Sequence, residues 1–454
     1  METITIQSSK SVKPAHSMGT SWDTHQAVDV IPLSVFDEVH DEYMSSIHAF
    51  HPPSPTNATL EAGLARALAE YREWAGRLAV VDPSTGRRAI LLNDAGVRLV
   101  EATADVALED FVHLLRPGSS AARRLHPSGE GAEELMLVQV TRFTCGSMVV
   151  GHTMHHAIGD GLAICQCILA WGQATRGVVI DPVPVHDRAS LFVPRDPPLV
   201  EFDHRRTEFK VPDDDDNNDD DEKKYPCTAA DEAVVTHKVH FSREFISDLK
   251  SRASTASVLR PYSTMQCLVA HIWRCVTKAR ELDLDGCDST TTTLHMAVNG
   301  RARMRRPRVP EGYTGNVVLW AHPSTTAGEL VASSIGHVAE IIRREIGRVD
   351  DGYFRSFIDF IASGAVEEEG LEPMTDAAES PHAEVYCLYR IPFCDLDFGG
   401  GEQFMYMPSN EPVDGAVYIL PPNPQGDGSV EAHVSLFSSA MDAFKDCCHF
   451  KEYI

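Results

Sequence analysis

Short apolar runs with strand-like patterning alternate with longer segments of helical periodicity along the first part of the chain. The runs predict strands at 3–6, 89–93, 135–143 and 148–153. Apolar residues at helical spacing predict helices over 60–74 and 162–175. Strands that alternate with helices are typical of an α/β domain.

Regular periodicity fades between about 178 and 230, where prolines recur. This stretch includes the run 213–222, which has eight carboxylates and no apolar residue. Such a run repels itself and predicts a disordered surface loop. A calcium site is the alternative, but no glycine interrupts the run as an EF-hand loop requires. The stretch is interpreted as a crossover or linker.

The alternation resumes after the linker, with strands predicted at 233–241 and 291–299 and helices at 263–279 and 327–346. A chain of 454 residues is about three times a typical domain of ~150 residues. We therefore expect one domain over 1–190, a crossover over 191–230 and a second domain over 231–454.

Composition and charge narrow the class of protein. Forty Lys and Arg stand against 66 Asp and Glu, a formal charge of −26. This balance argues against nucleic acid or an anionic membrane as a partner, and it favours cationic ligands. The 11 cysteines contain no C-x-x-C pair, and no apolar stretch approaches the ~20 residues of a membrane span. We expect a soluble, monomeric cytoplasmic protein with reduced thiols.

The segment 149–162 contains the main candidates for catalytic residues. An apolar strand leads into His152, His155 and His156, and Asp160 stands where the N-cap of the next helix belongs. A histidine at the end of a strand is well placed for catalysis, because the scaffold there is rigid. The alternatives are packing histidines or zinc ligands. The spacing gives no i, i+4 histidine pair with a glutamate, so no metal is expected.

A second segment runs from Arg390 to Gly401 and contains Asp397-Phe398-Gly399-Gly400-Gly401. Consecutive glycines allow close approach of another chain or a ligand. D-F-G also occurs in protein kinases, but the other kinase motifs are absent from this sequence.

Together, H-x-x-x-D-G at 156–161 and D-F-G-G-G at 397–401 resemble the BAHD family of plant acyl-CoA-dependent acyltransferases. The resemblance covers essentially the whole chain. The D-F-G-G-G variant and the stretches 88–96 and 312–316 look most like the branch that acylates amines, particularly the agmatine coumaroyltransferases of grasses.

This resemblance implies an α/β fold of two domains, as in chloramphenicol acetyltransferase. Each domain would be a mixed sheet with flanking helices, and an active-site tunnel would lie at the interface. It implies that His156 is the general base and that acyl-CoA is a co-substrate, with no permanently bound cofactor. Structural roles fall to the other motif residues, namely Asp160, Gly161, Asp397, Phe398 and Gly399, and the aspartate of the first motif is expected to pair with an arginine.

The anionic coenzyme needs a local positive patch, and five arginines between 301 and 308 offer one. A solvated basic loop is the alternative. The resemblance places Arg301 and Arg303 near the coenzyme, and Ser263 and Thr264 near its pantetheine and phosphates, where a helix N-terminus favours anions.

Two departures from the family pattern concern tryptophans. Leu388 and Gly400 stand where many members carry an indole that could help stabilise the oxyanion. Losing such a donor costs on the order of 3 kcal/mol. A backbone N–H of the glycine run or the Tyr386 hydroxyl could replace it, or the missing bulk could widen the acceptor pocket around Gly400.

An amine acceptor is an ammonium before it reacts, so a carboxylate in its channel would attract it. Glu384 is the candidate, with Tyr386 on the same face of the predicted strand. An exposed glutamate at a strand end is the alternative.

The sequence thus predicts transfer of a hydroxycinnamoyl group, such as p-coumaroyl or feruloyl, from coenzyme A to an amine. Agmatine, putrescine, tryptamine and tyramine are candidate acceptors. The alternatives are an O-acyltransferase acting on an alcohol and a catalytically weak coenzyme A-binding homologue.

Overall fold

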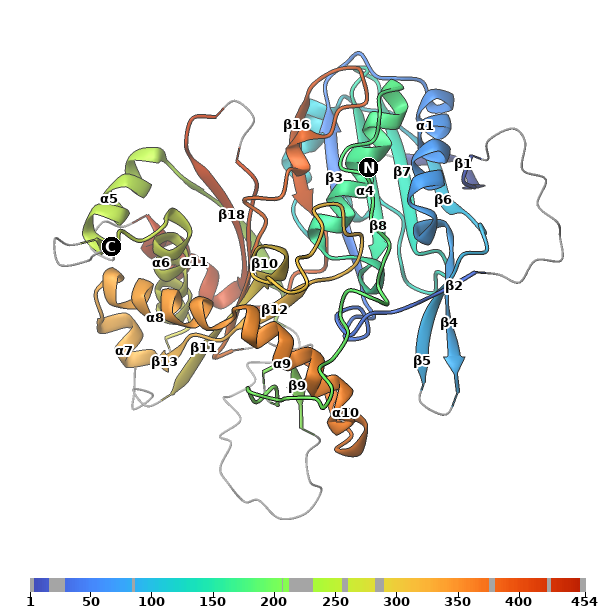
Figure 1. Ribbon diagram of the computed structural model, residues 1–454. Coiled ribbons are helices and arrows are strands. Elements are labelled where there is room, and N and C mark those ends of the chain that lie inside the picture. The colour runs from blue at the N-terminus through green and yellow to red at the C-terminus, as the bar shows by residue number, and fades with distance from the viewer. Residues whose placement is uncertain are drawn as a thin grey trace. The chain divides into compact units, whose positions relative to one another are not determined.

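The computed structural model (Figure 1) describes residues 4–15, 29–83, 86–205, 207–211, 232–254, 260–281, 290–374, 380–422 and 426–449. The acidic run 213–222 lies outside these residues. The chain divides into two compact units. The first comprises 1–193, 305–317 and 389–411, and the second comprises 194–304, 318–388 and 412–454. Each unit therefore draws on both halves of the chain, unlike the contiguous division expected from the sequence.

A six-stranded mixed sheet forms the centre of the first unit, with strand order β1-β6-β7-β8-β3-β16 in the described residues. Only β6 and β7 pair in parallel within this order. The last strand, β16, comes from the C-terminal part of the chain and pairs with β3. The strands are β1 (Ile4–Val12), β3 (Tyr43–Phe50), β6 (Val97–Ala104), β7 (Met136–Phe143), β8 (Met148–His155) and β16 (Gln403–Pro408).

Two helices, α1 (Asn57–Glu70) and α4 (Gly161–Arg176), lie side by side against this sheet (Figure 1). They approach closely because Gly63 has no side chain: a Cβ there would lie 2.1 Å from Thr175 Oγ1. Trp171 in α4 is buried, and its Nε1 donates to the Leu60 carbonyl at 2.8 Å. This contact fixes α4, which follows the His156 motif directly in sequence.

Shorter elements complete the first unit. A hydrophobic cluster joins Ile47, Ala49 and Val149 of the sheet to Phe111 and Leu125. The strands β2 (Val30–Pro32), β5 (Arg87–Leu91) and β4 (Arg77–Asp82) form a separate antiparallel sheet. The remaining helical segments are η1 (Arg72–Ala75), α2 (Leu108–Phe111), η2 (Val112–Leu114), α3 (Ser120–Arg123), η3 (His156–Ile158) and η6 (Phe393–Asp395).

The second unit contains another mixed sheet, ordered β10-β18-β17-β15-β11-β12 in its described part, with β13 also pairing with β11. The central strand β15 is parallel to both of its neighbours, β11 and β17. The strands are β10 (Val234–Phe241), β11 (Thr291–Asn299), β12 (Val318–Ala321), β13 (Ser324–Thr326), β15 (Ala383–Cys387), β17 (Ala416–Ile419) and β18 (Val430–Phe437). The short strands β9 (Phe209–Lys210) and β14 (Glu372–Pro373) pair separately.

Helices of the second unit include α6, whose apolar side is buried beside α5, α7, α8 and α11. The predicted helix over 327–346 is wrong as a single element, because it is two helices. Ser334 is the N-cap of the second, and its side chain accepts from the His337 amide, so the backbone bends there. The helical segments are α5 (Arg243–Ala253), α6 (Thr264–Ala279), η5 (Gly300–Ala302), α7 (Ala327–Ala332), α8 (Ile335–Arg348), α9 (Asp351–Ala362), α10 (Ala365–Glu368) and α11 (Ser438–Cys448).

The predicted α/β fold of two mixed sheets with flanking helices is confirmed. Among the described residues, no helix combines the length and apolar character needed to cross a membrane.

Candidate active site

His156 is held at the junction between β8 and α4 of the first unit. It follows the last residue of β8 and opens the short helix η3. Its amide donates to the Glu42 carbonyl at 2.8 Å, and its carbonyl accepts from Asn316 Nδ2 at 2.8 Å. The backbone that carries the imidazole is therefore bonded on both sides.

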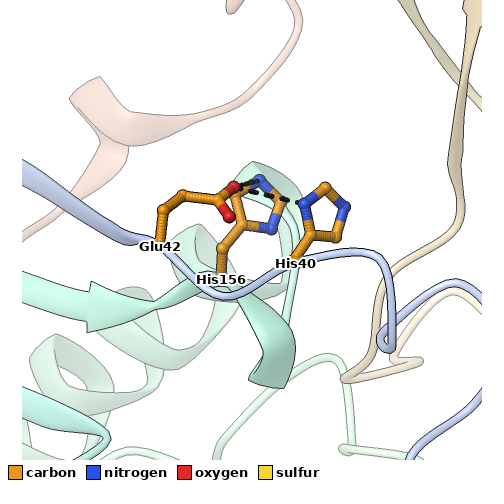
Figure 2. A group of neighbouring side chains, drawn as sticks. All are labelled: His40, Glu42 and His156. Carbon is orange, nitrogen blue, oxygen red and sulfur yellow. Dashed lines mark hydrogen bonds and ion pairs between the residues drawn. The ribbon is translucent and has the colours of Figure 1, made fainter. Parts of the chain in front are cut away.

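His40 and Glu42 come from the segment before β3 and complete a three-residue cluster with His156 (Figure 2). The His40 and His156 rings stack, with centroids 3.8 Å apart and planes at 18°. Glu42 Oε1 lies 3.2 Å from His40 Nδ1 and 3.9 Å from His156 Nε2. His156 Nδ1 is buried without a hydrogen-bond partner, so Nε2, on the Glu42 side, is the nitrogen open to chemistry.

The surroundings keep this histidine neutral and this glutamate charged. Burial, with a smaller contribution from the His40 ring, lowers the pKa of His156 to about 4, although the Glu42 carboxylate opposes the shift. Burial raises the pKa of Glu42, but the hydrogen bond with His40 and the His156 ring outweigh it and hold the pKa well below its usual range. At neutral pH the cluster therefore offers an unprotonated base beside an anion.

The segment that carries His40 and Glu42 is anchored by Asp37, which is fully buried. Asp37 Oδ2 accepts from the Ser34 amide at 2.8 Å and pairs with Arg188 Nη1 at 2.8 Å. Asp37 Oδ1 accepts from the amide and Nδ2 of Asn316 at 2.9 and 2.8 Å. Because Asn316 Nδ2 also donates to the His156 carbonyl, one amide group links the two segments of the cluster.

Asp160 shapes the turn after His156. Its Oδ1 accepts from the amides of Leu162 and Ala163 at 3.2 and 3.0 Å, which caps α4. Its Oδ2 accepts from the Val317 amide at 3.0 Å. These contacts agree with a structural role. Arg188 is bonded to Asp37 and to the Ile158 carbonyl, beside the same turn.

The second motif packs along the far part of α4. Asp397 pairs with Arg176 at 3.0 Å, and Phe398 meets Trp171 edge to face with centroids 4.9 Å apart. Gly399 has φ +80° and lies against the Arg176 side chain. Arg176 ends the helix whose first residue is Gly161, and 15 residues at 1.5 Å each span about 22 Å. The motif is therefore remote from His156.

Gly400 therefore does not lie among the residues around His156. A Cβ at Gly400 would lie 2.4 Å from the Pro53 carbonyl oxygen, so the glycine permits close packing of two backbones. The amides of Gly399 and Gly401 donate to Asp397 Oδ1 and to the Pro53 carbonyl at 2.7 and 2.5 Å. Gly400 therefore packs against backbone at Pro53, away from His156, and the amides of Gly399 and Gly401 are already bonded within the first unit.

In the second unit, Glu384 and Tyr386 lie on β15. Glu384 is buried and pairs in register with His295 of β11. Tyr386 stacks on Tyr418, with centroids 4.8 Å apart and planes at 10°, and meets Trp320 edge to face. The exposed glutamate considered as an alternative is thus excluded, and an aromatic row lies beside a buried carboxylate.

The residues expected near coenzyme A lie toward one end of the second unit's sheet. Ser263 caps α6 in a capping box with Gln266. Trp273 Nε1 donates to Thr292 Oγ1 at 3.1 Å, and Arg280 reaches the His382 carbonyl just before β15, so α6 runs antiparallel to β11. The N-terminus of α6 therefore lies toward the end of β11 that Arg301 and Arg303 follow.

His40, Glu42 and Asp37 were missed by reasoning from the sequence. They belong to a short polar segment without a motif, and only the fold brings it beside β8. Asn316 closes the stretch 312–316, which the family resemblance singled out without assigning it a contact.

Known proteins resemble this chain over almost its whole length. Residues 2–450 match the family model described as the Transferase family. The chain is 55% identical to agmatine hydroxycinnamoyltransferase 1 of Oryza sativa subsp. japonica, covering 98% of both chains. It is also 55% identical to agmatine coumaroyltransferase-1 of Hordeum vulgare, covering 98% of this chain and 99% of that protein.

Solved structures agree on the fold. The chain matches TRI101 of F. sporotrichioides, complexed with coenzyme A and T-2, with a TM-score of 0.75 and 19% identity over 94% of this chain and 98% of the other. The family match and the two cereal relatives agree with the pair of motifs and with the histidine held at the end of β8. The chain therefore belongs to the Transferase family, the BAHD acyltransferases.

Proposed function

We propose that the chain transfers a hydroxycinnamoyl group from coenzyme A to a primary amine, with agmatine as the preferred acceptor. The observation that carries the proposal is the pairing of a neutral His156 with the anionic Glu42, 3.9 Å from its Nε2. The similarity to the rice and barley enzymes supports the acyl group and the acceptor.

The reaction needs a base for one proton. The acceptor arrives as an ammonium and first loses one proton to solvent. The neutral amine nitrogen then attacks the thioester carbonyl carbon as His156 Nε2 takes a second proton from that nitrogen. The tetrahedral intermediate then collapses, the C–S bond breaks, and the protonated His156 returns the proton to the thiolate of coenzyme A. A positioned base of this kind contributes roughly 10²- to 10⁴-fold to the rate.

Glu42 acts on the amine before this step. An ammonium within hydrogen-bond reach of His156 Nε2 would also lie beside the Glu42 carboxylate, which is half exposed at 52% of its side chain. The carboxylate attracts the cation and orients its nitrogen toward the base. Because its pKa is lowered, Glu42 stays an anion and does not serve as the base itself.

Glu384 is proposed to bind a cationic group of the acceptor, as the sequence suggests. A guanidinium is planar and binds a carboxylate through two parallel hydrogen bonds, and it also stacks on aromatic rings. Glu384 with the neighbouring rings of Tyr386, Tyr418 and Trp320 provides both kinds of partner. This combination favours agmatine, which carries a guanidinium, over putrescine, which carries an ammonium.

The remaining roles follow the sequence-based expectations. Ser263, Thr264, Arg301 and Arg303 are proposed to bind coenzyme A, because a helix N-terminus and guanidinium groups both favour phosphates. Tyr386 is one of the two donors that the sequence offers for the oxyanion, and this role is an alternative to stacking on the guanidinium. Replacing it with Phe should lower kcat on the order of 10²-fold if its hydroxyl serves that purpose.

The test is a panel of acceptors. The protein is incubated with p-coumaroyl-CoA and agmatine, putrescine, tryptamine, tyramine or shikimate, and release of the coenzyme A thiol is followed. Release should be fastest with agmatine. Failure to release thiol with any amine would overturn the proposal, and a preference for shikimate would favour O-acylation.

The contribution of Glu384 is tested by comparing agmatine with putrescine. Glu384→Gln should raise KM for agmatine more than tenfold, with a smaller effect on putrescine. Glu372→Gln, at an exposed position of β14 in the same unit, is the control. Equal effects on both amines would contradict recognition of the guanidinium by Glu384.

A further inference from the structure

The cluster of His40, Glu42 and His156 has the donor set of a metal site. It offers two imidazole nitrogens and one carboxylate oxygen, and these three atoms all lie within 4.8 Å of one another. Zinc and other first-row divalent ions bind such sets in proteins. The cluster was invisible in the sequence because His40 and Glu42 lie more than 110 residues before His156.

We propose that a divalent transition-metal ion, represented by Zn²⁺, binds His40 Nδ1, Glu42 Oε1 and His156 Nε2 and inhibits the enzyme. The ion would occupy the same nitrogen that is proposed to act as the base. The part of the inference that concerns inhibition rests on the proposed function, whereas the binding site itself does not.

The two distances to the carboxylate are close to those of a tetrahedral site. Two donors bound to one tetrahedral Zn²⁺ at about 2.0–2.1 Å lie roughly 3.4 Å apart. Glu42 Oε1 already lies 3.2 Å from His40 Nδ1 and 3.9 Å from His156 Nε2. The rings are stacked with planes at 18°, so one ring must rotate until the ion lies in the planes of both, and the half-exposed Glu42 side chain can follow it (Figure 2).

The backbone of the cluster is held from several sides, which favours ion binding because little ordering is left to occur. Asp37, buried with Arg188, fixes the start of the segment. The His40 carbonyl accepts from Arg88 Nη2 at 2.9 Å, and the Glu42 carbonyl accepts from the His156 amide. The side chains of His40 and His156 are each 14% exposed, which leaves a path for an ion and for a water molecule as the fourth ligand.

Inhibition follows from the chemistry of the coordinated nitrogen. An Nε2 lone pair bound to a metal ion cannot accept a proton from an amine. The positive ion also neutralises Glu42 and so removes the attraction for an ammonium. Zn²⁺ should therefore compete with the amine acceptor and leave the binding of acyl-CoA little changed.

Binding is tested on the full chain without reference to activity. Protein freed of metal by a chelator, which is then removed, is titrated with ZnCl₂ in a calorimeter and with CoCl₂ while visible absorption is recorded. Wild type should bind one ion at this site, and His40→Ala and Glu42→Gln should each weaken that binding by about tenfold or more. His337→Ala is the matched control, because His337 lies 3.5 Å from Glu329 in a surface pair outside the cluster.

Two outcomes would overturn the site. Equal Zn²⁺ affinity in wild type, His40→Ala and Glu42→Gln would place the ion elsewhere, as would intense thiolate absorption with Co²⁺. Circular dichroism establishes that each variant is folded, and His40→Gln replaces His40→Ala if the latter is not. In the activity arm, Zn²⁺ should inhibit thiol release, agmatine should oppose the inhibition and a chelator should reverse it. If no amine is acylated at all, the proposed function fails while the titration still decides the metal site.

Discussion

His156 is a weaker base in the folded chain than in solution, because its pKa falls to about 4. Its value lies in being unprotonated at every pH at which an amine could react. Glu42 supplies what the ring does not, a fixed negative charge close to Nε2. In the proposed mechanism the two residues have separate roles: the carboxylate attracts a cation and the imidazole accepts a proton from the amine nitrogen.

This division predicts a particular pH profile. Since His156 is already neutral at pH 6, the acceptor amine alone changes protonation between pH 6 and 9. With agmatine, kcat/KM should rise about tenfold per pH unit over this range, as the fraction of neutral amine does. Initial rates at low agmatine concentration measure it. An inflection near pH 6.5, the ordinary value for histidine, would show that the base titrates there and contradict the account.

The role of Glu42 can be distinguished from that of His156, because the loss of its charge should weaken binding of the acceptor. Glu42→Gln keeps the size of the side chain and removes its charge, so KM for agmatine should rise about tenfold or more. The KM for p-coumaroyl-CoA should stay within twofold. Glu130→Gln, at an exposed position of the same unit, is the control. An unchanged KM for agmatine would exclude Glu42 from acceptor binding.

At the scale of elements, the site depends on a polar network beneath it. Asp37 is buried beside Arg188 and also receives two hydrogen bonds from Asn316. Removing one partner of a buried ion pair costs about 3–5 kcal/mol, because the other charge is left without compensation. The segment that bears His40 and Glu42 is attached to this network, so its loss should also disturb the cluster.

Asp37→Ala should therefore lower the free energy of unfolding by about 3–5 kcal/mol and reduce activity in the fraction that remains folded. Denaturant unfolding measures the first effect. Glu411→Ala breaks the exposed pair with Arg123 in the same unit and should cost about 0–1 kcal/mol. Similar costs for the two variants would show that the Asp37 network does not anchor the segment.

Gly400 offers a second test at this scale. Gly400→Ala places a Cβ against the Pro53 carbonyl and should lower the thermal midpoint without changing the preference among amines. Gly347→Ala in α8 is the control, because no atom lies within 4 Å of the new Cβ, and alanine should stabilise that helix. A changed amine preference in Gly400→Ala would show that Gly400 contributes to the acceptor site.

Periodicity and caps predicted most elements of the fold from the sequence. Asp160 and Ser263 mark the starts of α4 and α6, and the strand predicted at 291–299 has the observed bounds of β11. Contacts made by distant segments were beyond such reasoning. The pairing of β16 with β3 and the approach of Glu42 to His156 depend on the complete fold, because neither leaves a local pattern.

The whole molecule contains several buried histidines whose neutral form is favoured by burial. In the first unit burial lowers the pKa of His48 and His156 to about 4. In the second unit it lowers the pKa of His204, His322 and His433 to about 4 and that of His295 to about 3. Glu208 is a buried acid whose pKa changes in the opposite direction, because burial raises it to about 8.

These shifts predict how stability depends on pH. Between about pH 6.5 and 4 these histidines bind protons in the unfolded chain but not in the folded one. The free energy of unfolding therefore falls as the pH drops through this range. Glu208 contributes stability at low pH that is lost as the pH rises toward 8. The thermal midpoint should therefore be highest slightly above pH 7, where the unfolded histidines are largely neutral, and fall most steeply below about pH 6.5. A midpoint that stays constant from pH 7 to 5 would contradict the prediction.

The central claim is that His156 is the base of an amine acyltransferase. Its most direct test is kcat/KM for agmatine with p-coumaroyl-CoA, measured at pH 8 for wild type and His156→Ala side by side. We expect a loss of about 10²- to 10⁴-fold in a variant whose circular dichroism matches the wild type. A folded His156→Ala protein that transfers the acyl group at the wild-type rate would contradict the claim.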